Sequence, residues 1–481
     1  MVSTPNGSRL SSIFKAYDVR GTVPDQLDAA TLHAIGVGMA RFARRAEGAK
    51  SCVVGRDMRE SGVEFSKAFS AGLISEGMEV LDIGLCSTDM LYFASGHLDR
   101  PGAMLTASHN PSNYNGIKFC LARAKPVGQD SGLLDIRLAA EEALPSAPPG
   151  GGAGEVAGNP AYAEVDLLAD FARHVHSFVD LGVLRPLKIV ADTANGMGGL
   201  VAPAVFRGLP FELEVLFGEL DGTFPNHPAD PIQIENQADL RARLLATGAD
   251  VGLAFDGDAD RVFLVDDKAQ PVSGSLTTAI VAAAMLDKHP AATILYNLIC
   301  SKAVPEIVAE RGGTPVRTRV GHSFVKAVMA ETGAVFGGEH SGHYYFSDNF
   351  RADSGIIAAI TVLEVMSNTG QSLSELRKPF DRYADSGEIN TEVGDPAAVI
   401  AGIEERFAAS GGSADHLDGL TVDRGDWWFN LRPSNTEPLL RLNVEAASSQ
   451  ECAARVDEVL GQIRELGAAG GPTNRSAQNG T

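Results

Sequence analysis

Short apolar runs alternate with longer segments of helical periodicity through residue 370 of the chain. Residues 52–54, 187–190, 251–255 and 294–296 are such runs, and the first three lead into a glycine or an aspartate. Runs of this length are typical of strands, and strands that alternate with helices form parallel α/β layers. A helix is the usual connection between parallel strands. The pattern therefore predicts an α/β protein.

The chain is expected to divide at segments that are poor in large side chains. Residues 145–160 (PSAPPGGGAGEVAGNP) cannot recover the entropy lost on ordering, which predicts a surface linker or loop. A second break falls at residues 367–371, after a helical pattern. Beyond residue 384 the pattern of expected strands and helices changes. It predicts a smaller α+β domain, with strands at 388–393 and 427–431 and helices at 396–409 and 450–466. At about 100–200 residues per domain, the 481 residues leave room for three to four domains.

Net charge limits the partners of this chain. Its 40 Lys and Arg residues against 61 Asp and Glu residues give a formal charge of −21. Nucleic acid and anionic membranes would be repelled by such a field, so we expect neither as a partner. A small anionic substrate remains compatible, because it responds to the local potential inside one cleft.

Targeting and redox signals predict a cytoplasmic protein. Residues 1–10 lack the basic region and following apolar run of a secretory signal. The most apolar stretch, residues 276–286, is too short to span a bilayer. The 5 cysteines are few, odd in number and widely spaced, which fits a reducing compartment and excludes a disulfide scaffold.

The first of four polar loops is TASHNP at residues 106–111, which follows an apolar run. Ser108 stands beside His109 at the end of an expected strand, in a turn restricted by Asn-Pro, as a nucleophile can be placed. The alternative is an ordinary turn in which Ser108 and Asn110 bond to nearby backbone. The spacing differs from the nucleophile-elbow pattern G-x-S-x-G, so this loop alone leaves both interpretations open.

The second loop, DGDADR at residues 256–261, places Asp256, Asp258 and Asp260 between two apolar runs. Carboxylates at alternate positions on extended backbone project to one side, and Mg²⁺, Mn²⁺ or Ca²⁺ would relieve their repulsion. An EF-hand requires Gly at its sixth position and Glu at its twelfth, where this chain has Arg261 and Asp267. A solvated acidic turn is the other alternative, and a metal site is the better interpretation.

The third and fourth loops suit a sugar and a phosphate. GEHSGH at residues 338–343 presents Glu339 and Ser341 to sugar hydroxyls; a zinc site is the rival, but the order H-E-x-x-H is absent. RPSNTEP at residues 432–438 combines a guanidinium, two hydroxyls and an amide between prolines, which suits a phosphate, although a polar turn is equally compatible. No Walker loop G-x-x-x-x-G-K-[ST] occurs, which argues against nucleoside triphosphate hydrolysis of that type.

Together these loops provide the parts needed to move a phosphoryl group on a phosphosugar. The chain resembles the α-D-phosphohexomutase superfamily, most closely its bacterial phosphomannomutase and phosphomannomutase/phosphoglucomutase members, over about residues 10–465. The resemblance rests on TASHNP, DGDADR, GEHSGH and RPSNTEP, in that order and one per domain. Any one motif is only suggestive, whereas four in series are specific.

The resemblance implies four domains around a central cleft: three related α/β domains with mixed sheets and a C-terminal α+β domain. We place the α/β domains at residues 1–158, 159–261 and 262–370, the α+β domain at 371–469, and a disordered tail at 470–481. On this division the four loops fall in the four domains in order, with the metal loop at the end of the second.

The resemblance also implies a role for individual residues. Ser108 would carry the phosphoryl group and supply one phosphoserine oxygen to a single Mg²⁺ ion, which Asp256, Asp258 and Asp260 would also bind. The residues that match family positions at the transferring phosphate are Arg20, Asn110, Lys118 and Arg261. The matches at the cleft and the substrate are Tyr17, His322, Glu339, Ser341, His343, Arg432, Ser434, Asn435 and Thr436.

One position departs from the family pattern. Many relatives carry a lysine near the position where this chain has Ile299, whereas Lys302 stands three residues later. Either Lys302 takes over a contact to phosphate or hydroxyl, or substrate handling differs.

The implied reaction interconverts mannose 6-phosphate and mannose 1-phosphate through phosphorylated Ser108 and a hexose 1,6-bisphosphate, which also serves as activator. The bisphosphate must turn end for end, so the cradle at Arg432 must grip either phosphate. A general base must take the sugar hydroxyl proton; Lys118, His322 and His109 are candidates, and we favour the first two.

The substrate and the assembly are less constrained. His340 at the variable place of the third loop favours mannose, and glucose phosphates are expected as well because the epimers differ at one hydroxyl. The alternatives are a phosphoglucosamine mutase, a phosphoserine-dependent sugar phosphatase and a non-catalytic phosphosugar-binding regulator. We expect a monomer or a homodimer.

Overall fold

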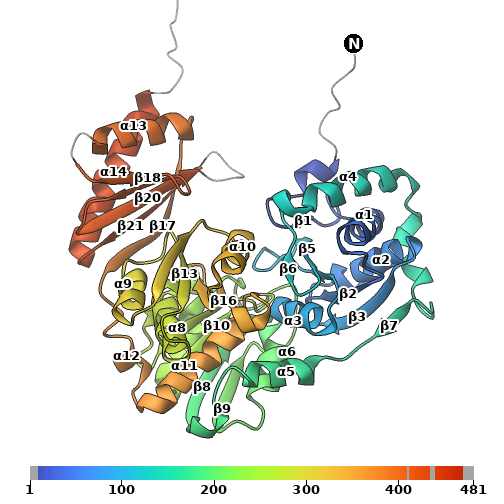
Figure 1. Cartoon of the computed structure of the whole chain (residues 1–481), viewed down its shortest axis with the longest axis horizontal. Helices are drawn as coiled ribbons and strands as arrows, with labels where there is room; N and C mark the ends of the chain where they lie inside the picture. Colours follow the sequence, from blue (N-terminus) through green and yellow to red (C-terminus); the bar gives the residue numbers. More distant parts are fainter. Residues whose placement is uncertain (1–8, 409–410, 434–438, 470–481) are drawn as a thin grey trace, which may run out of the picture.

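The computed structural model describes residues 9–408, 411–433 and 439–469. Its four sheets follow one another along the chain, and Figure 1 shows the first and fourth units on opposite sides with the second and third between them. Three units combine mixed sheets with helices, and the fourth packs helices against an antiparallel sheet. The predicted fold class is confirmed. The predicted tail at residues 470–481 lies outside the described residues.

The first unit is a seven-stranded sheet in the order β1-β5-β4-β2-β3-β7, with β6 paired to β5. Its strands are β1 (Val19–Thr22), β2 (Ser51–Arg56), β3 (Glu79–Leu85), β4 (Gly102–Leu105), β5 (Tyr114–Leu121), β6 (Lys125–Pro126) and β7 (Tyr162–Glu164). Its helices are α1 (Ala29–Glu47), α2 (Ser61–Ser75), α3 (Thr88–Leu98) and α4 (Leu133–Ala143), with 3-10 turns η1 (Arg9–Ser12), η2 (Gln129–Ser131), η3 (Leu144–Ser146) and η4 (Pro149–Glu155). Strand β5 returns antiparallel to β4, so the turn between them carries the TASHNP loop.

The second unit is a five-stranded sheet in the order β12-β11-β10-β8-β9. Its elements are α5 (Leu168–His176), η5 (Leu181–Val183), β8 (Leu187–Asp192), α6 (Gly198–Phe206), β9 (Phe211–Leu216), η6 (Ile234–Gln237), α7 (Ala238–Thr247), β10 (Val251–Phe255), β11 (Val262–Asp266) and β12 (Pro271–Val272). Strands β10 and β11 form an antiparallel pair in which Phe255 lies opposite Val262. The DGDADR loop is the connection between them.

The third unit is a four-stranded sheet in the order β14-β13-β15-β16. Its elements are α8 (Gly274–Lys288), β13 (Thr293–Asn297), α9 (Ala303–Glu310), β14 (Thr314–Thr318), α10 (His322–Thr332), β15 (Phe336–Gly338), β16 (Tyr344–Phe346), η7 (Ser347–Asn349) and α11 (Gly355–Thr369). Strands β15 and β16 are antiparallel, and the GEHSGH loop joins them.

The fourth unit is a five-stranded antiparallel sheet in the order β17-β21-β20-β19-β18. Its elements, with the short helix that precedes them, are α12 (Leu373–Leu376), β17 (Ala384–Glu392), α13 (Pro396–Ala408), β18 (Ser413–Asp415), β19 (Leu420–Asp423), β20 (Trp427–Pro433), β21 (Leu439–Ala446) and α14 (Ser449–Ala469). Residues 434–438, between β20 and β21, lie outside the described part of the chain.

The buried apolar side chains connect the first three units. One cluster runs from α3 in the first unit through the second sheet to α8 and α11 of the third, with Phe93, Phe255 and Ile357 among its members. The fourth unit has a core of its own around Trp427 and Phe429. Because the first three units share a core, the loops at their sheet edges are held at defined distances.

Two features of the structure bear on the expected division of the chain. The sheets extend past the boundaries expected at residues 158 and 261, because β7 pairs with β3 and because β11 and β12 complete the sheet begun by β8. The segment at residues 145–160, expected to be a surface linker or loop, is partly exposed and also packs against the first unit through η4. Gly151 is buried at φ +64°, where a Cβ would lie 2.3 Å from the carbonyl oxygen of Ala29, so glycine lets η4 pack closely on α1.

Among the described residues, no helix combines the length and the apolar character that crossing a bilayer requires.

Candidate active site

Ser108 follows β4 in a backbone conformation that serine rarely adopts. Its φ is +51°, in the left-handed region, and its amide donates to Thr106 Oγ1 at 2.8 Å. This conformation costs about 1 kcal/mol or more and persists only where surrounding contacts hold it. Ser108 is buried, and its Oγ donates to Asp256 Oδ2 at 2.9 Å.

The acidic loop reaches the serine loop through a glycine. A Cβ on Gly257 would lie 2.5 Å from the carbonyl oxygen of Ser108, so no larger residue fits here without moving the backbone. Asp256, Asp258 and Asp260 are at most 1% exposed, and their carboxylates offer oxygens within 4.8 Å of one another. The structure thus brings Ser108 to the three aspartates.

Two buried oxygen atoms of this loop are evidence for a cation site. Asp258 Oδ1 and Asp260 Oδ1 are buried and accept no hydrogen bond from the described residues. Such oxygens are costly to bury unless something else satisfies them, and hard oxygen ligands are the donors that Mg²⁺ prefers. The acidic group could therefore hold a metal ion.

Lys118 and Arg261 balance part of the negative charge. Lys118 Nζ lies 2.7 Å from both Asp258 Oδ2 and Asp260 Oδ2, and Arg261 Nη2 lies 2.8 Å from Asp256 Oδ2. Burial raises the pKa of Asp256 to about 7, with the neighbouring carboxylates adding to it against the opposing effect of Arg261. Burial opposes the charge of Asp258 as well, yet the ammonium of Lys118 holds its pKa below the usual value.

The surroundings of His109 favour the neutral form of its ring. Burial and then the guanidinium of Arg261 lower the pKa of His109 well below 6.5. Its Nδ1 lies 3.3 Å from Ser108 Oγ and 2.5 Å from Arg261 Nη2. The guanidinium donates, so Nδ1 is the acceptor nitrogen of the ring.

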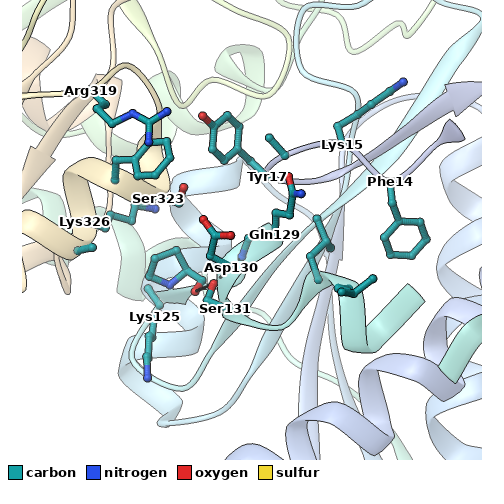
Figure 2. Close-up of a pocket in the computed structure, with 18 of the residues that line it drawn as sticks. Phe14, Lys15, Tyr17, Lys125, Gln129, Asp130, Ser131, Arg319, Ser323 and Lys326 are labelled. Atoms are coloured by element: carbon teal, nitrogen blue, oxygen red, sulfur yellow. Dashed lines mark hydrogen bonds between the residues drawn. The ribbon is translucent and has the colours of Figure 1, made fainter. Parts of the chain in front are cut away.

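Arg20 and Tyr17 approach from the segment around β1. Arg20 Nε pairs with Asp18 at 2.7 Å, and its Nη1 donates to Asn110 Oδ1 in the serine loop. The Tyr17 hydroxyl lies 3.4 Å from the carbonyl oxygen of Val320 in the third unit. Figure 2 shows Tyr17 between the first and third units, at a cavity of about 1130 Å³ that Arg319 and Lys326 also line.

The GEHSGH loop at residues 338–343, which is expected to face the sugar and is called the sugar loop from here on, is held by its own unit. The Glu339 carboxylate accepts from the hydroxyl of Tyr345 at 2.5 Å, the amide of Asn297 at 3.1 Å and the backbone N–H of Gly321 at 3.1 Å. Ser341 and His343 are half-buried.

His343 joins the sugar loop to the acidic loop. Its Nδ1 lies 2.8 Å from Asp353 Oδ2 and 3.8 Å from Asp260 Oδ1. Burial lowers the pKa of His343, but these two carboxylates raise it more, so the net shift is upward. Asp260, His343 and Asp353 form a second group that could hold a metal ion, although Lys326 Nζ already pairs with Asp353 at 3.0 Å.

The remaining predicted residues lie in the third and fourth units or outside the described chain. Lys302 Nζ donates to Asp423 Oδ1 at 2.7 Å and to the carbonyl oxygen of Gly425 at 2.8 Å, both in the fourth unit. Arg432 is buried at the end of β20 and pairs with Glu388 of β17. His322 is the first residue of α10, beside Gly321. Ser434, Asn435 and Thr436 fall in the segment that the structure leaves undescribed.

Three buried residues at the site were missed by sequence reasoning. Thr88 Oγ1 donates to Asp258 Oδ2 at 2.6 Å, and Lys326 contacts Asp353 behind His343. Arg59 lies under the serine loop. Only Arg59 had a signal, because the GRDMR segment follows an apolar run as the other polar loops do.

Sequence models of a single family match most of the chain. Those of the phosphoglucomutase/phosphomannomutase alpha/beta/alpha domains I, II and III match residues 11–140, 169–270 and 273–383, and that of the C-terminal domain matches residues 388–462. Phosphohexose mutases from Xanthomonas campestris pv. campestris are 40% identical over 439 residues, covering 90% of this chain and 94% of theirs. A phosphomannomutase from Salmonella montevideo is 38% identical over 455 residues, covering 93% and 98%.

A solved structure gives the same result. The phosphoglucomutase/phosphomannomutase family protein of Burkholderia thailandensis superposes with a TM-score of 0.84 at 31% identity, covering 96% of this chain and 98% of that one. A four-domain fold with a serine, an acidic triad and a sugar loop defines a phosphohexomutase, an enzyme of the isomerase class. The chain belongs to the phosphoglucomutase/phosphomannomutase family.

Proposed function

We propose that this enzyme interconverts mannose 6-phosphate and mannose 1-phosphate through a phosphoserine at Ser108 and a hexose 1,6-bisphosphate, with Mg²⁺ at the acidic loop. The observation that carries the proposal is the contact between Ser108 Oγ and Asp256 inside a buried acidic triad. The phosphomannomutase relatives favour mannose phosphates, and the family name adds glucose phosphates as a second substrate pair to test.

In-line phosphoryl transfer needs positioning and charge neutralisation more than covalent chemistry. Asp256, Asp258 and Asp260 would hold Mg²⁺, which supplies charge neutralisation at the transferring group when bound. Arg261 and Lys118 add fixed positive charge at the same place, and Arg20 braces Asn110 of the serine loop.

The reaction needs two proton acceptors, one for the hydroxyl of Ser108 and one for the hydroxyl of the sugar. When Ser108 takes a phosphoryl group from the bisphosphate, its hydroxyl proton must leave, and neutral His109 offers an acceptor nitrogen 3.3 Å away. The sugar hydroxyl needs a second base. Asp258 and Asp260 outweigh burial and raise the pKa of Lys118 well above 10.5, which favours Lys118 as a phosphate contact. His322 is thus the stronger candidate base for the sugar.

The bisphosphate must be held while it turns. Glu339, Ser341 and His343 are the proposed hydroxyl contacts, and Arg432 with Ser434, Asn435 and Thr436 is the proposed cradle for the distal phosphate. His340 supports the choice of sugar only indirectly, because its Nδ1 lies 2.9 Å from Ser275 Oγ.

The test is a product assay. Phosphorylated enzyme incubated with mannose 1-phosphate, Mg²⁺ and a trace of hexose 1,6-bisphosphate should yield mannose 6-phosphate. Release of inorganic phosphate in excess of isomerisation would identify a phosphatase instead. Turnover of a hexosamine phosphate in preference to both hexose phosphates would overturn the assignment of substrate.

A further inference from the structure

Arg59 is a buried guanidinium that binds the backbone of the serine loop. It lies between β2 and α2, is 1% exposed, and makes no contact with the acidic triad within hydrogen-bond distance. Its Nη1 and Nη2 donate to four carbonyl oxygens, three in the serine loop and one at the first residue of β5: Ser108 at 2.9 Å, Asn110 at 2.6 Å, Pro111 at 2.8 Å and Tyr114 at 2.9 Å. Its Nε donates to Asp57 Oδ2 at 3.2 Å.

These contacts use every donor that the side chain has. A guanidinium carries five N–H groups in a planar fork, and here all of them point at oxygens. The Asp57 carboxylate is itself buried and also accepts the backbone N–H of Arg59 at 3.0 Å, which sets the direction of the fork. One rigid guanidinium group, that of Arg59, thus binds all of these carbonyl oxygens.

The second unit closes over this group from the other side. The Arg59 guanidinium lies 5.1 Å from the ring centroid of Phe224. A Cβ on Gly222 would lie 2.6 Å from the Cα of Arg59, so the loop after β9 touches the backbone here. Arg59 is therefore fixed against the second unit, which also carries the acidic triad.

The Ser108 backbone is the part that needs this support. Its left-handed φ of +51° is unfavourable for serine, and Arg59 binds the carbonyl oxygen of that same residue. The same carbonyl oxygen is the atom that approaches Gly257 of the acidic loop. Arg59 thus holds the one peptide group on which both the strained turn and the contact between the loops depend.

We propose that Arg59 is a positioning residue of the phosphoryl transfer: it holds the Ser108 turn so that the serine oxygen faces the acidic triad. This inference rests on the proposed function. Lysine at this position would keep the charge but has three donors on one atom, so it could not pair four carbonyl oxygens and Asp57 together.

The test compares Arg59→Lys with a matched control, Arg377→Lys. Arg377 is also largely buried, and its Nη1 binds Asp266 Oδ2 at 3.2 Å and the carbonyl oxygen of Pro271 at 3.1 Å. Both variants are expected to lower Tm. Arg59→Lys should lower kcat by about 100-fold, as expected for a reacting atom displaced by about 1 Å, with KM for the sugar phosphate nearly unchanged. Arg377→Lys should keep the wild-type kcat.

A second variant covers the case in which Arg59→Lys fails to fold. Asp57→Asn keeps the volume and weakens the contacts that anchor Arg59 while leaving its guanidinium in place, and we expect a smaller fall in kcat with unchanged KM. Hydrogen exchange at residues 108–111, read without substrate, should be faster in both Arg59→Lys and Asp57→Asn than in Arg377→Lys.

The possible outcomes distinguish a failure of the role proposed for Arg59 from a failure of the proposed mutase function. An active wild type with an unchanged kcat in Arg59→Lys, or with equal losses in Arg59→Lys and Arg377→Lys, would overturn the role of Arg59 and leave the proposed function intact. A wild type without mutase activity would contradict the proposed function, and the hydrogen exchange of the serine loop would then still decide whether Arg59 holds the turn.

Discussion

Asp258 contacts Lys118 through one carboxylate oxygen and leaves the other, Oδ1, without a hydrogen bond from the described residues. Asp258→Asn keeps the shape and removes the charge, so we expect weaker Mg²⁺ binding and a lower kcat. The Mg²⁺ concentration for half-maximal activity should rise by about tenfold or more. Activity titrated against Mg²⁺ measures this.

The matched control for that variant is Asp287→Asn. Asp287 is exposed and pairs with Arg311 on the surface of the third unit, away from the serine loop. A normal Mg²⁺ titration for Asp258→Asn, like that of the control, would exclude Asp258 as a ligand.

Asp89 predicts a pH dependence of stability. Burial raises its pKa from 3.8 to about 7, although Ser354 donates to it at 2.6 Å. Between these values the native state binds more protons than the unfolded chain, so this group makes stability fall as pH rises through the window. At about 1.4 kcal/mol per pKa unit, the loss amounts to a few kcal/mol.

Asp89→Asn removes the titration. The Tm of the variant relative to the wild type should therefore rise between pH 4 and about 7 and stay constant above that. A difference in Tm that does not change across this range would show that Asp89 is not the titrating group.

At the scale of elements, the distance between two loops is set by Gly257. Gly257→Ala places a Cβ 2.5 Å from the carbonyl oxygen of Ser108, which must then move away from the acidic loop. We expect kcat to fall by about 100-fold, since displacement of about 1 Å at a reacting group can cost that much. Steady-state kinetics measure it.

Gly394→Ala is the control, because a Cβ there meets nothing within 4 Å. The control should keep full activity and a normal Tm. Full activity in Gly257→Ala would mean that the close approach of the two loops is not needed for turnover.

Elements with a clear hydrophobic pattern were predictable from the sequence. The run at residues 251–255 is strand β10, residues 427–431 lie inside β20, and residues 396–409 match α13 to within one residue. Strands β6 and β12 have two residues each, too few to show any periodicity. The packing of Gly151 in η4 against α1 was not predictable, because composition alone does not reveal close backbone contacts.

The residues of the candidate site also fall into those that the sequence could predict and those that it could not. Three aspartates in one loop and a serine in another could be found because each motif is contiguous in sequence. Thr88 and Lys326 could not, because their roles depend on contacts with Asp258 and Asp353 that only the folded chain creates. Residues that come together only in the folded chain leave no contiguous motif in the sequence.

At the scale of the whole molecule, Lys302 connects the third and fourth units. It is a candidate for a contact to phosphate or hydroxyl, and in the structure its ammonium binds Asp423 and the carbonyl oxygen of Gly425. If this contact positions the fourth unit, Lys302→Met and Asp423→Asn should raise KM by a similar factor. A partly exposed ion pair of about 0.2–1 kcal/mol gives at most about fivefold.

The double variant decides between the two roles. Loss of one shared contact predicts that Lys302→Met with Asp423→Asn is no worse than either single variant. A direct contact from Lys302 to the substrate predicts instead that Asp423→Asn has a normal KM.

The proposed passage of one phosphoryl group from Ser108 to the sugar can be tested directly. Enzyme carrying ³²P on Ser108 is mixed with unlabelled mannose 1-phosphate and Mg²⁺, with Ser108→Ala as the unlabelled control. We predict that the label leaves the protein into a hexose bisphosphate and then into mannose 6-phosphate. Label that stays on the protein, or that appears only as inorganic phosphate, would contradict the account.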